Sequence, residues 1–507
     1  MESFDVIIVG GGLSGVGTAC HLREKCPGKS FVILEGRERL GGTWDLFRYP
    51  GIRSDSDMHT LGFNFKPWKE AKSIADGPSI LKYIKETAEE FDLGGHVRYQ
   101  HMVTGASWDT KSASWVVEAK CGETGAALRF RARMLSMCSG YYSYSEWHDP
   151  EFKDRDTYQG DILHPQAWPD EYDYAGKRVL VIGSGATAMT IVPAMADGGA
   201  EVTMVQRSPT YVVSRPDQDK IANFLRKMLP ERTAYALTRL KNILLSRYFY
   251  HQCMTHPEKV REKLIGFVRK HLGPDYDTDT HFSPKYNPWE QRMCLIPNAD
   301  LFRTINEGKV NVVTDGIERF TEKGLRLISG QELEADIIVA ATGLKLRVLG
   351  GVQFKVDGRD IDFSETFTYK GLMYSDVPNL VQTFGYINAS WTLRSDLTAE
   401  YLCRLVNHMD ATQVRQCTPR LREEDRGMPE RSWIENFSSG YMQRSMHLFP
   451  KQSDRAPWHN PQRYALDKKM IRHGALEDGT LVFDNPAGAS NEAEVIDLAL
   501  AGDRKAA

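Results

Sequence analysis

The stretch FDVIIVGGGLSG, Phe4 to Gly15, decides the fold of this chain. An apolar run ends in a glycine turn, and a helix-compatible segment then leads to a second apolar run, SFVILEG (30–36). This order predicts the strand, tight turn, helix and second strand of a βαβ unit, which opens a parallel sheet. The same order returns in KRVLVIG (177–183), SGATAMTIVPAMADGG (184–199) and EVTMVQR (201–207). We therefore predict an α/β chain in which a Rossmann-like fold occurs twice.

The bulk properties narrow the class of protein. The chain has 507 residues, which favours two or three domains, and its 41% hydrophobic and 26% charged residues are typical of globular proteins. A net charge of -3 gives no reason to expect nucleic acid as a partner, and no apolar run reaches the length of a membrane span. The start lacks the basic segment of a secretory signal, and the eight cysteines contain no C-x-x-C pair. We expect a cytoplasmic protein with reduced thiols and no metal site.

The first glycine turn has the spacing of a dinucleotide site. Gly10, Gly12 and Gly15 form G-x-G-x-x-G directly after the predicted strand. Such glycines make a tight turn, let a pyrophosphate approach the backbone, and let helix and strand pack closely. Glu35 ends the second predicted strand, twenty residues after Gly15, where a carboxylate can accept hydrogen bonds from ribose hydroxyls. A purely structural glycine turn is the alternative to this nucleotide site.

The second glycine turn lacks an acidic residue at the position that corresponds to Glu35 after the first turn. It consists of Gly183, Gly185 and Ala188, and Arg207 and Ser208 stand where a carboxylate would bind an unmodified ribose. A guanidinium makes bidentate contacts to phosphate, so this pair favours the 2′-phosphate of NADPH over NADH, unless Arg207 is only a surface arginine. The first turn then binds the other dinucleotide, for which we predict FAD.

The rest of the chain suggests how the two folds are arranged. A basic, helix-periodic segment at about 215–280 has 13 Lys and Arg against 5 Asp and Glu between residues 215 and 270. We interpret it as a helical insertion with a solvated basic face; peripheral contact with an anionic membrane is the alternative. The expected parts are a first FAD-binding part (1–150), a linker (151–176), an NADP-binding domain with its insertion (177–340), a returning FAD-binding part (341–460) and a C-terminal tail (461–507), whose end we expect to fray.

Several motifs in this order carry a family resemblance. YQGDILHPQAWP (158–169) fits the pattern F-x-G-x-x-x-H-x-x-x-W-P, with Tyr158 in place of the first Phe. This pattern is the fingerprint of the flavin-dependent Baeyer–Villiger monooxygenases, which the chain resembles over most of residues 1–410. GGTWDLFRYPGIRSD (41–55) and NPWEQRMCLIPNADLF (287–302) resemble most closely the bacterial branch that includes the mycobacterial ethionamide-activating enzyme.

The resemblance implies an activity. It implies an FAD- and NADPH-dependent enzyme that converts ketones to esters or lactones with molecular oxygen, through a flavin peroxide, and that also oxygenates thioethers or thioamides. An N- or S-oxygenating flavin-containing monooxygenase is one alternative. A non-catalytic flavin and NADPH redox sensor is the other.

The resemblance also implies roles for a loop arginine and an aspartate. Arg292 matches the family's catalytic arginine, whose permanent charge stabilises anions that form during oxygen transfer. Family members commonly have Lys-Arg here, whereas this chain has Gln291. Asp55 matches the aspartate that orients the arginine, with Asp57 as its close competitor.

Further residues receive binding roles from the resemblance. The fingerprint residues Gly160, His164 and Trp168 would belong to a linker that couples domain rotation to NADP binding; a hydrogen-bonded packing histidine is the alternative for His164. The helix that begins near Asn388 and Ser390 would point at the flavin. Flavin contacts would be Ser14, Glu35, Thr43, Trp44, Asp45, Leu46, Asp55 and Val103, and NADP contacts would be Arg53, Ser54, Ser184, Ala186 and Thr187 beside the second turn.

Overall fold

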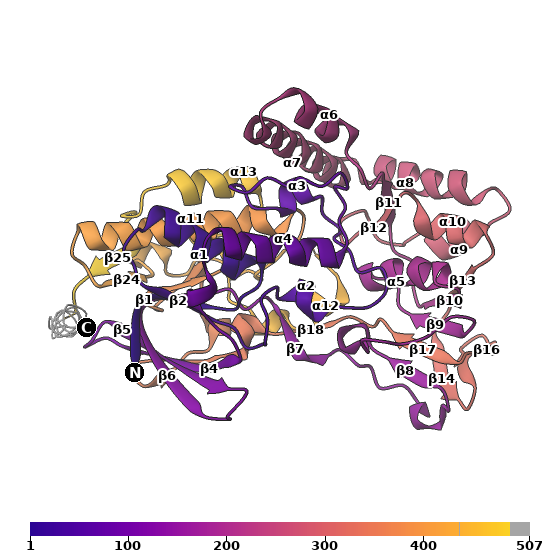
Figure 1. Cartoon of the computed structure of the whole chain (residues 1–507), viewed down its shortest axis with the longest axis horizontal. Coiled ribbons are helices and arrows are strands. Elements are labelled where there is room, and N and C mark those ends of the chain that lie inside the picture. Colours follow the sequence, from indigo (N-terminus) through magenta and orange to yellow (C-terminus); the bar gives the residue numbers. More distant parts are fainter. Residues whose placement is uncertain (436, 487–507) are drawn as a thin grey trace.

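The computed structural model describes residues 1–435 and 437–486, and two sheets organise them (Figure 1). The first sheet runs in the order β20-β19-β4-β5-β6-β1-β2-β3, and β23 also pairs with β6. β3, β2, β1, β6 and β23 are mutually parallel, while β4 and β5 form an antiparallel extension. The strands are β1 Glu2–Val9, β2 Phe31–Leu34, β3 Val97–Arg98, β4 His101–Asp109, β5 Ser114–Cys121, β6 Ala127–Met137, β19 Gln353–Val356, β20 Arg359–Asp360 and β23 Leu380–Gln382.

The second sheet is wholly parallel and runs in the order β13-β10-β9-β17-β8. Its strands are β8 Asp161–Leu163, β9 Arg178–Ile182, β10 Glu201–Gln206, β13 Val310–Thr314 and β17 Ile337–Ala340. Each sheet contains a βαβ unit with a glycine turn, so the prediction of two Rossmann-like folds is confirmed. One boundary differs from expectation, because residues 161–163 of the expected linker pair with β17 as the edge strand of this sheet.

Helices and small sheets complete the fold. The small sheets join β7 (Tyr142–Trp147) to β18 (Leu344–Leu346), β11 (Val212–Arg215) to β12 (Cys294–Pro297), β14 (Ile317–Thr321) to β15 (Gly324–Leu327) and β16 (Glu332–Glu334), β21 (Thr368–Tyr369) to β22 (Met373–Tyr374), and β24 (Gln416–Pro419) to β25 (Leu481–Asp484). The α-helices are α1 Leu13–Lys25, α2 Thr43–Leu46, α3 Met58–Leu61, α4 Gly77–Glu90, α5 Ala186–Asp197, α6 Lys220–Met228, α7 Glu231–Thr255, α8 Pro257–Leu272, α9 Thr278–Phe282, α10 Asp300–Asn306, α11 Trp391–Ala411, α12 Gly440–Gln443 and α13 Tyr464–Asp467. Short turns of other helix types are η1 Gly94–His96, η2 Arg155–Thr157, η3 Pro165–Ala167, η4 Val348–Gly351, η5 Phe363–Glu365, η6 Glu423–Asp425, η7 Met446–Leu448 and η8 Lys468–Arg472.

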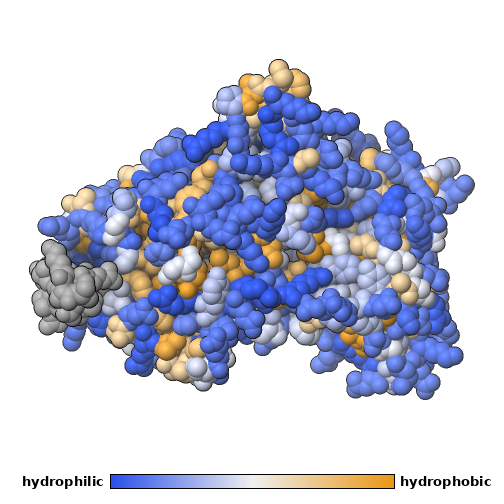
Figure 2. Space-filling view, viewed as in Figure 1, coloured by the Kyte–Doolittle hydropathy of each residue, from blue (hydrophilic) through white to orange (hydrophobic). Residues whose placement is uncertain are grey.

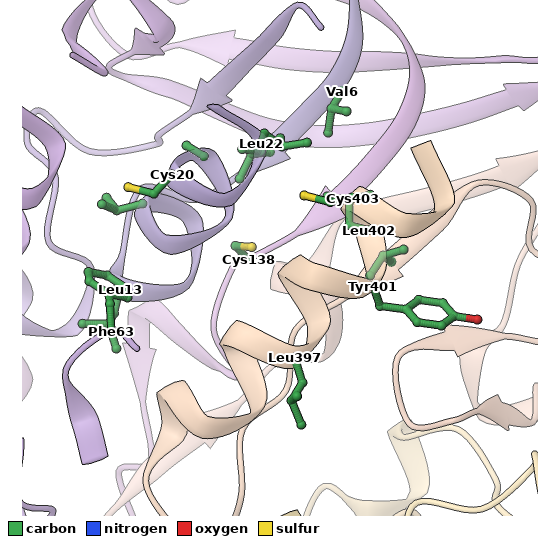
Figure 3. Close-up of a cluster of buried hydrophobic side chains, with 14 of the residues drawn as sticks. Val6, Leu13, Cys20, Leu22, Phe63, Cys138, Leu397, Tyr401, Leu402 and Cys403 are labelled. Carbon is green, nitrogen blue, oxygen red and sulfur yellow. The ribbon is translucent and has the colours of Figure 1, made fainter. Parts of the chain in front are cut away.

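We call the first sheet with the elements packed on it the first half of the molecule, and the second sheet with the elements packed on it the second half. The core of the first half lies where α1 and α11 pack together beside the first sheet (Figure 3). Every residue of α1 from Leu13 to Leu22 is buried, and all are small or apolar except His21, whose ring bonds to the Asp396 carboxylate at 3.2 Å. Cys20 and Leu22 come from α1 and Leu397 and Leu402 from α11, and all four are at most 1% exposed. Burying such side chains stabilises the fold by roughly 1.5–3 kcal/mol each. This packing fixes the position of the first glycine turn at the start of α1.

The helical insertion leaves the second half and contacts the first. Helices α6 to α9 lie between β11 and β12, which pair with each other in parallel. From α7, the Tyr235 hydroxyl donates to the Phe63 carbonyl at 2.9 Å, and Arg239 donates to the carbonyls of His59 and Gly62 at 2.9 and 2.8 Å. The insertion therefore connects the two halves beside the loop that contains Asp55.

The C-terminal region differs from the expected tail. The Asp467 carboxylate accepts a hydrogen bond from the Tyr386 hydroxyl at 2.8 Å and lies 2.8 Å from the Arg394 guanidinium, and both members of this ion pair are buried. β25 pairs with β24. Residues 464–484 are thus part of the first half, because a buried charge on α11 needs its partner there. Residues 487–507, where we expected fraying, lie outside the described residues.

Candidate active site

A cavity of about 1230 Å³ lies between the two glycine turns. It opens at the carboxyl ends of β1 and β9, which is where open parallel sheets bind ligands. Eighteen of the predicted site residues line it: Gly10, Gly12, Ser14, Glu35, Thr43, Trp44, Arg53, Ser54, Asp55, Val103, Gly183, Ser184, Gly185, Ala186, Thr187, Arg207, Ser208 and Arg292.

Four other predicted site residues lie behind the residues that line the cavity. A Cβ atom on Gly15 would lie 1.9 Å from the Gly10 carbonyl oxygen, so this glycine serves the close approach of α1 to β1. Ala188 is buried in the core beneath the second turn. The Asp45 carboxylate is buried and accepts from Arg37 and Arg39 at 2.7 and 3.1 Å, while Leu46 packs against the core. These four residues shape the cavity without lining it.

The first turn has free donors at a helix start. Gly10 has φ +102°, and α1 begins after Gly12 without a side-chain cap. The first-turn N–H groups are therefore available to an anion, as in dinucleotide sites. A Cβ on Gly42 would lie 2.9 Å from the Gly12 Cα, so only glycine permits this approach of the two loops. The Glu35 carboxylate accepts from the N–H groups of Gly11 and Arg37 at 2.6 and 2.8 Å, and burial raises its pKa.

The second turn repeats this arrangement with a cation beside it. Gly183 has φ +134°, and α5 begins after Gly185, again without a side-chain cap. The Ser184 hydroxyl donates to the Ser208 carbonyl at 3.0 Å, which ties the turn to the end of β10. Arg207 is exposed there, lines the cavity, and forms no ion pair with any described residue. The donor set at this turn fits a phosphorylated ribose.

Arg292 and Asp55 meet in the same cavity. The Nε and Nη2 atoms of Arg292 both donate to Oδ2 of Asp55, with the Nε distance at 3.0 Å. The carboxylate raises the pKa of the Arg292 guanidinium above its ordinary value, against the opposing effect of burial. The side chains are 35% and 32% exposed, and both line the cavity. No described residue accepts a hydrogen bond from Nη1 of Arg292, so this donor is available to a bound molecule.

The backbone of Arg292 is held from two sides. Its N–H donates to the Ser439 hydroxyl at 3.2 Å, and its carbonyl accepts from the Thr210 hydroxyl at 3.3 Å. Asp57, the competitor of Asp55, is engaged elsewhere: its carboxylate caps α3 at the Thr60 N–H and accepts from Asn242 at 2.8 Å. The geometry therefore pairs Arg292 with Asp55.

Arg53 and the residues at the start of α11 also make specific contacts. Arg53 donates to Asp300 at 2.5 Å and to the Met189 carbonyl on α5, which links the first half to the second. The Trp391 indole donates to the Ser14 hydroxyl at 2.8 Å, where α11 meets the first turn. The hydroxyl of Ser390, the residue before α11, bonds to Thr60, and neither Ser390 nor Asn388 lines the cavity.

Two tyrosines beside Arg292 were missed by the sequence analysis. Tyr141 and Tyr441 line the cavity, burial raises the pKa of both, and both lie near enough to affect the pKa of Arg292. Tyr141 lies four residues beyond the end of β6, and the rule that ligands bind beyond the carboxyl ends of parallel strands could have found it. Tyr441 and Ser439 belong to the expected returning FAD-binding part (341–460), and no local signal in the sequence marks them.

The fingerprint residues lie outside the cavity lining. A Cβ on Gly160 would meet the Tyr158 hydroxyl at 2.4 Å and the Asp336 carbonyl oxygen at 2.6 Å. The His164 ring stacks on Trp147 at 4.8 Å, its Nδ1 accepts from the Gln166 N–H, and burial lowers its pKa to about 4. Trp168 packs against the core of the second half. These residues fix the crossing between the halves, where β7 and β18 also pair.

Comparisons with known proteins define the class. Residues 73–349 match the family model described as flavin-binding monooxygenase-like, and residues 8–76 match an NAD(P)-binding Rossmann-like domain. The chain belongs to the flavin-binding monooxygenase-like family. It is 50% identical over 483 residues to the FAD-containing monooxygenase EthA of Mycobacterium tuberculosis, with 95% of this chain and 98% of that protein covered.

Solved structures share the fold at low identity. An oxidized steroid monooxygenase bound to NADP has a TM-score of 0.74 at 21% identity, with 95% of this chain and 100% of that one covered. A polycyclic ketone monooxygenase from Thermothelomyces thermophila also has a TM-score of 0.74, at 18% identity, with 96% and 90% covered. Within the described residues, no cluster of His, Cys, Asp and Glu could hold a metal ion.

Proposed function

We propose that this flavin-dependent monooxygenase uses FAD and NADPH to oxidise ketones to esters or lactones, the Baeyer–Villiger reaction. Membership of the flavin-binding monooxygenase-like family supports the class of enzyme. The polycyclic ketone monooxygenase among the similar structures supports ketones as substrates. The observation that carries the proposal is the Arg292–Asp55 pair in the cavity between the two glycine turns.

In this proposal FAD lies at the first turn and NADPH at the second. Gly12 and the uncapped start of α1 bind the FAD pyrophosphate, and Glu35 binds its ribose. Gly185 and the start of α5 bind the NADPH pyrophosphate, and Arg207 binds the 2′-phosphate. When bound, FAD reduced by NADPH supplies the activation of oxygen.

Arg292 then acts on the oxygen atom of the substrate. Negative charge develops on the carbonyl oxygen when a ketone is attacked, and Nη1 of Arg292 is free to donate to it. A fixed cation in a cavity stabilises such charge without reorganisation, and removing one comparable donor costs about 3–4 kcal/mol. Asp55 holds the guanidinium in position and raises the pKa of Arg292 further, so this arginine stays a cation.

The experiment combines product analysis with matched variants. FAD-loaded protein is incubated with NADPH, oxygen and linear, cyclic and aryl ketones, and products are identified by mass spectrometry. We expect esters or lactones from the wild type, and roughly a hundredfold to thousandfold less from Arg292→Ala. The control Arg347→Ala removes another arginine of the lining, whose partner is the surface residue Glu146, and retains activity.

Oxygenation of sulfur or nitrogen would give a different result. Transfer of oxygen to the sulfur of a thioether or thioamide places no negative charge on a carbonyl oxygen, so it does not require Arg292. If Arg292→Ala retained all esters and lactones, or if no ketone were oxygenated while an added thioether or amine gave a sulfoxide or N-oxide, the Baeyer–Villiger proposal would be wrong and the monooxygenase class would stand. NADPH consumption that no substrate accelerates would favour the redox-sensor alternative.

A further inference from the structure

Helices α6 and α7 carry an unusual concentration of exposed apolar side chains. More than half of the large hydrophobic residues that are exposed in the described chain fall within residues 221–254. We define the insertion face as the eight of them on α6 and the first part of α7, each 45–65% exposed: Ile221, Phe224, Met228, Leu237, Leu240, Leu244, Leu245 and Tyr248. Figure 2 shows hydrophobic residues gathered at the top of the molecule, where Figure 1 places these helices.

The insertion face is continuous. On α6 its residues recur at spacings of three and four, and on α7 Leu237, Leu240, Leu244 and Tyr248 do the same. Residues at these spacings share one side of a helix, and the two helices pack against each other. Contiguous exposed apolar surface of this kind marks a site of protein or membrane contact.

The polarity of α7 is reversed relative to an ordinary surface helix. Its buried side contains the polar residues Thr238, Arg239 and Asn242 beside Ala234, Tyr235 and Cys253. Arg239 and Asn242 bond to the first half, for example Asn242 to Asp57 at 2.8 Å. Its outward side contains the leucines. An ordinary surface helix turns its apolar side to the core. Arg239 and Asn242 are thus bonded inside the protein, whereas the leucines on the outward side are about half exposed.

The charges beside the insertion face are positive. Lys220, Lys227, Arg232 and Arg247 are exposed and form no ion pair with any described residue. The only acid on α6 and α7 is Glu231, and Lys69 neutralises it at 3.0 Å. Apolar helices flanked by free lysine and arginine bind anionic lipid surfaces. A second copy of this chain would instead bring like charges together, which disfavours self-association through this face.

We propose that the insertion face docks the protein on an anionic lipid surface. The apolar side chains enter the boundary between headgroups and acyl chains, and the four cations contact lipid phosphates. The contact is peripheral: no helix in residues 1–435 and 437–486 is long and apolar enough to cross a membrane. The exposed Tyr248 suits the interface, since its ring is apolar and its hydroxyl polar.

Vesicle flotation tests the docking proposal. FAD-loaded protein is mixed with vesicles of phosphatidylcholine alone, or of phosphatidylcholine with phosphatidylglycerol. We expect the wild type to float with the anionic vesicles, and the bound fraction to fall as salt rises. Leu240→Gln/Leu244→Gln and Lys227→Glu/Arg247→Glu should each weaken the partition by roughly tenfold or more. FAD content and NADPH oxidation in solution, which these surface residues do not serve, verify folding.

One control variant and several possible outcomes decide whether the docking proposal holds. Leu466→Gln removes a leucine that is also half-exposed but lies on α13, and it should float like the wild type. Failure of the wild type to float with anionic vesicles, or equal flotation of the double variants, would overturn the proposal. A wild-type dimer in sedimentation velocity that Leu240→Gln/Leu244→Gln makes monomeric, without vesicle binding, would assign the face to self-association instead.

Discussion

A single carboxylate oxygen of Asp55 accepts hydrogen bonds from both Nε and Nη2 of Arg292, across 237 positions of the chain. Asp55 precedes α3 in the first half, whereas Arg292 precedes β12 in the second. The pair therefore exists only when the two halves have the relative placement seen here. Because both bonds come from Nε and Nη2, the third nitrogen of the guanidinium, Nη1, stays available to the cavity.

Replacing Asp55 should impair ketone oxygenation through Arg292. In Asp55→Ala the guanidinium loses the partner that orients it, and we expect kcat to fall roughly a hundredfold. Asp55→Asn retains an acceptor and should lose less. The matched control is Asp57→Ala, which removes the cap of α3 and should cost about 1 kcal/mol of stability. Steady-state kinetics and thermal unfolding separate the two; equal kinetic loss in both variants would contradict the assigned role of Asp55.

Replacing Arg207 should weaken the preference for NADPH. Arg207→Gln removes the free cation at the second turn, and we expect KM for NADPH to rise roughly tenfold to hundredfold. KM for NADH should stay nearly constant, since an unmodified ribose offers no phosphate. Arg215→Gln, at an exposed arginine at the end of β11, is the control. A parallel rise for NADH would show that Arg207 is not specific for the 2′-phosphate.

His164 should make stability depend on pH. Burial holds the pKa of His164 at about 4 in the folded protein, against about 6.5 for an unfolded histidine. Above about pH 6.5 the ring is neutral in both states, so its burial does not lower the free energy of unfolding. Between about pH 6.5 and 4 the unfolded histidine binds a proton that the folded one does not, so the free energy of unfolding falls, by at most about 3 kcal/mol. Urea unfolding of the wild type and His164→Gln at several pH values measures it. Between about pH 6.5 and 4, His164→Gln should lose less of its free energy of unfolding than the wild type does. The control His251→Gln, at an exposed histidine, should lose as much as the wild type.

The buried ion pair of the C-terminal region should be essential for stability. Arg394 and Asp467 are 1% and 0% exposed, so Asp467→Asn leaves a buried cation without its charge partner. We expect a loss of about 3–5 kcal/mol in the free energy of unfolding. Asp454→Asn, at the exposed ion pair with Arg431, should cost less than about 1 kcal/mol. Similar unfolding midpoints for the two variants would show that residues 464–484 contribute little to the first half.

Much of the fold was predictable from local patterns. The glycine turns, the apolar strands and the acid-to-arginine change at the second turn lie within short stretches, and the family and its two Rossmann-like folds are confirmed. Longer-range features were harder. The expected tail contains strand β25 and a buried ion pair, and the expected linker contains the edge strand β8. Neither strand was predictable, because both are too short to have a periodicity of their own.

The site residues can likewise be divided into those that a local sequence pattern predicts and those that it does not. Gly10, Gly12, Gly183 and Gly185 could be placed because a phosphate turn constrains consecutive residues. Tyr441 could not, since its contact with the Arg292 region depends on how a distant, irregular segment crosses the cavity. The roles of Arg292 and Asp55 came from resemblance alone, and they stay predictions until the variants are measured.

The sequence by itself thus determined two dinucleotide folds and the difference between their ribose positions, since backbone turns and strand periodicity are set by neighbours in the chain. Only the tertiary structure decided that Arg292 meets Asp55, and that α7 turns Arg239 inward and Leu240 outward. Composition shows how many apolar and charged residues a helix has. Which side of that helix meets the protein depends on every element packed around it.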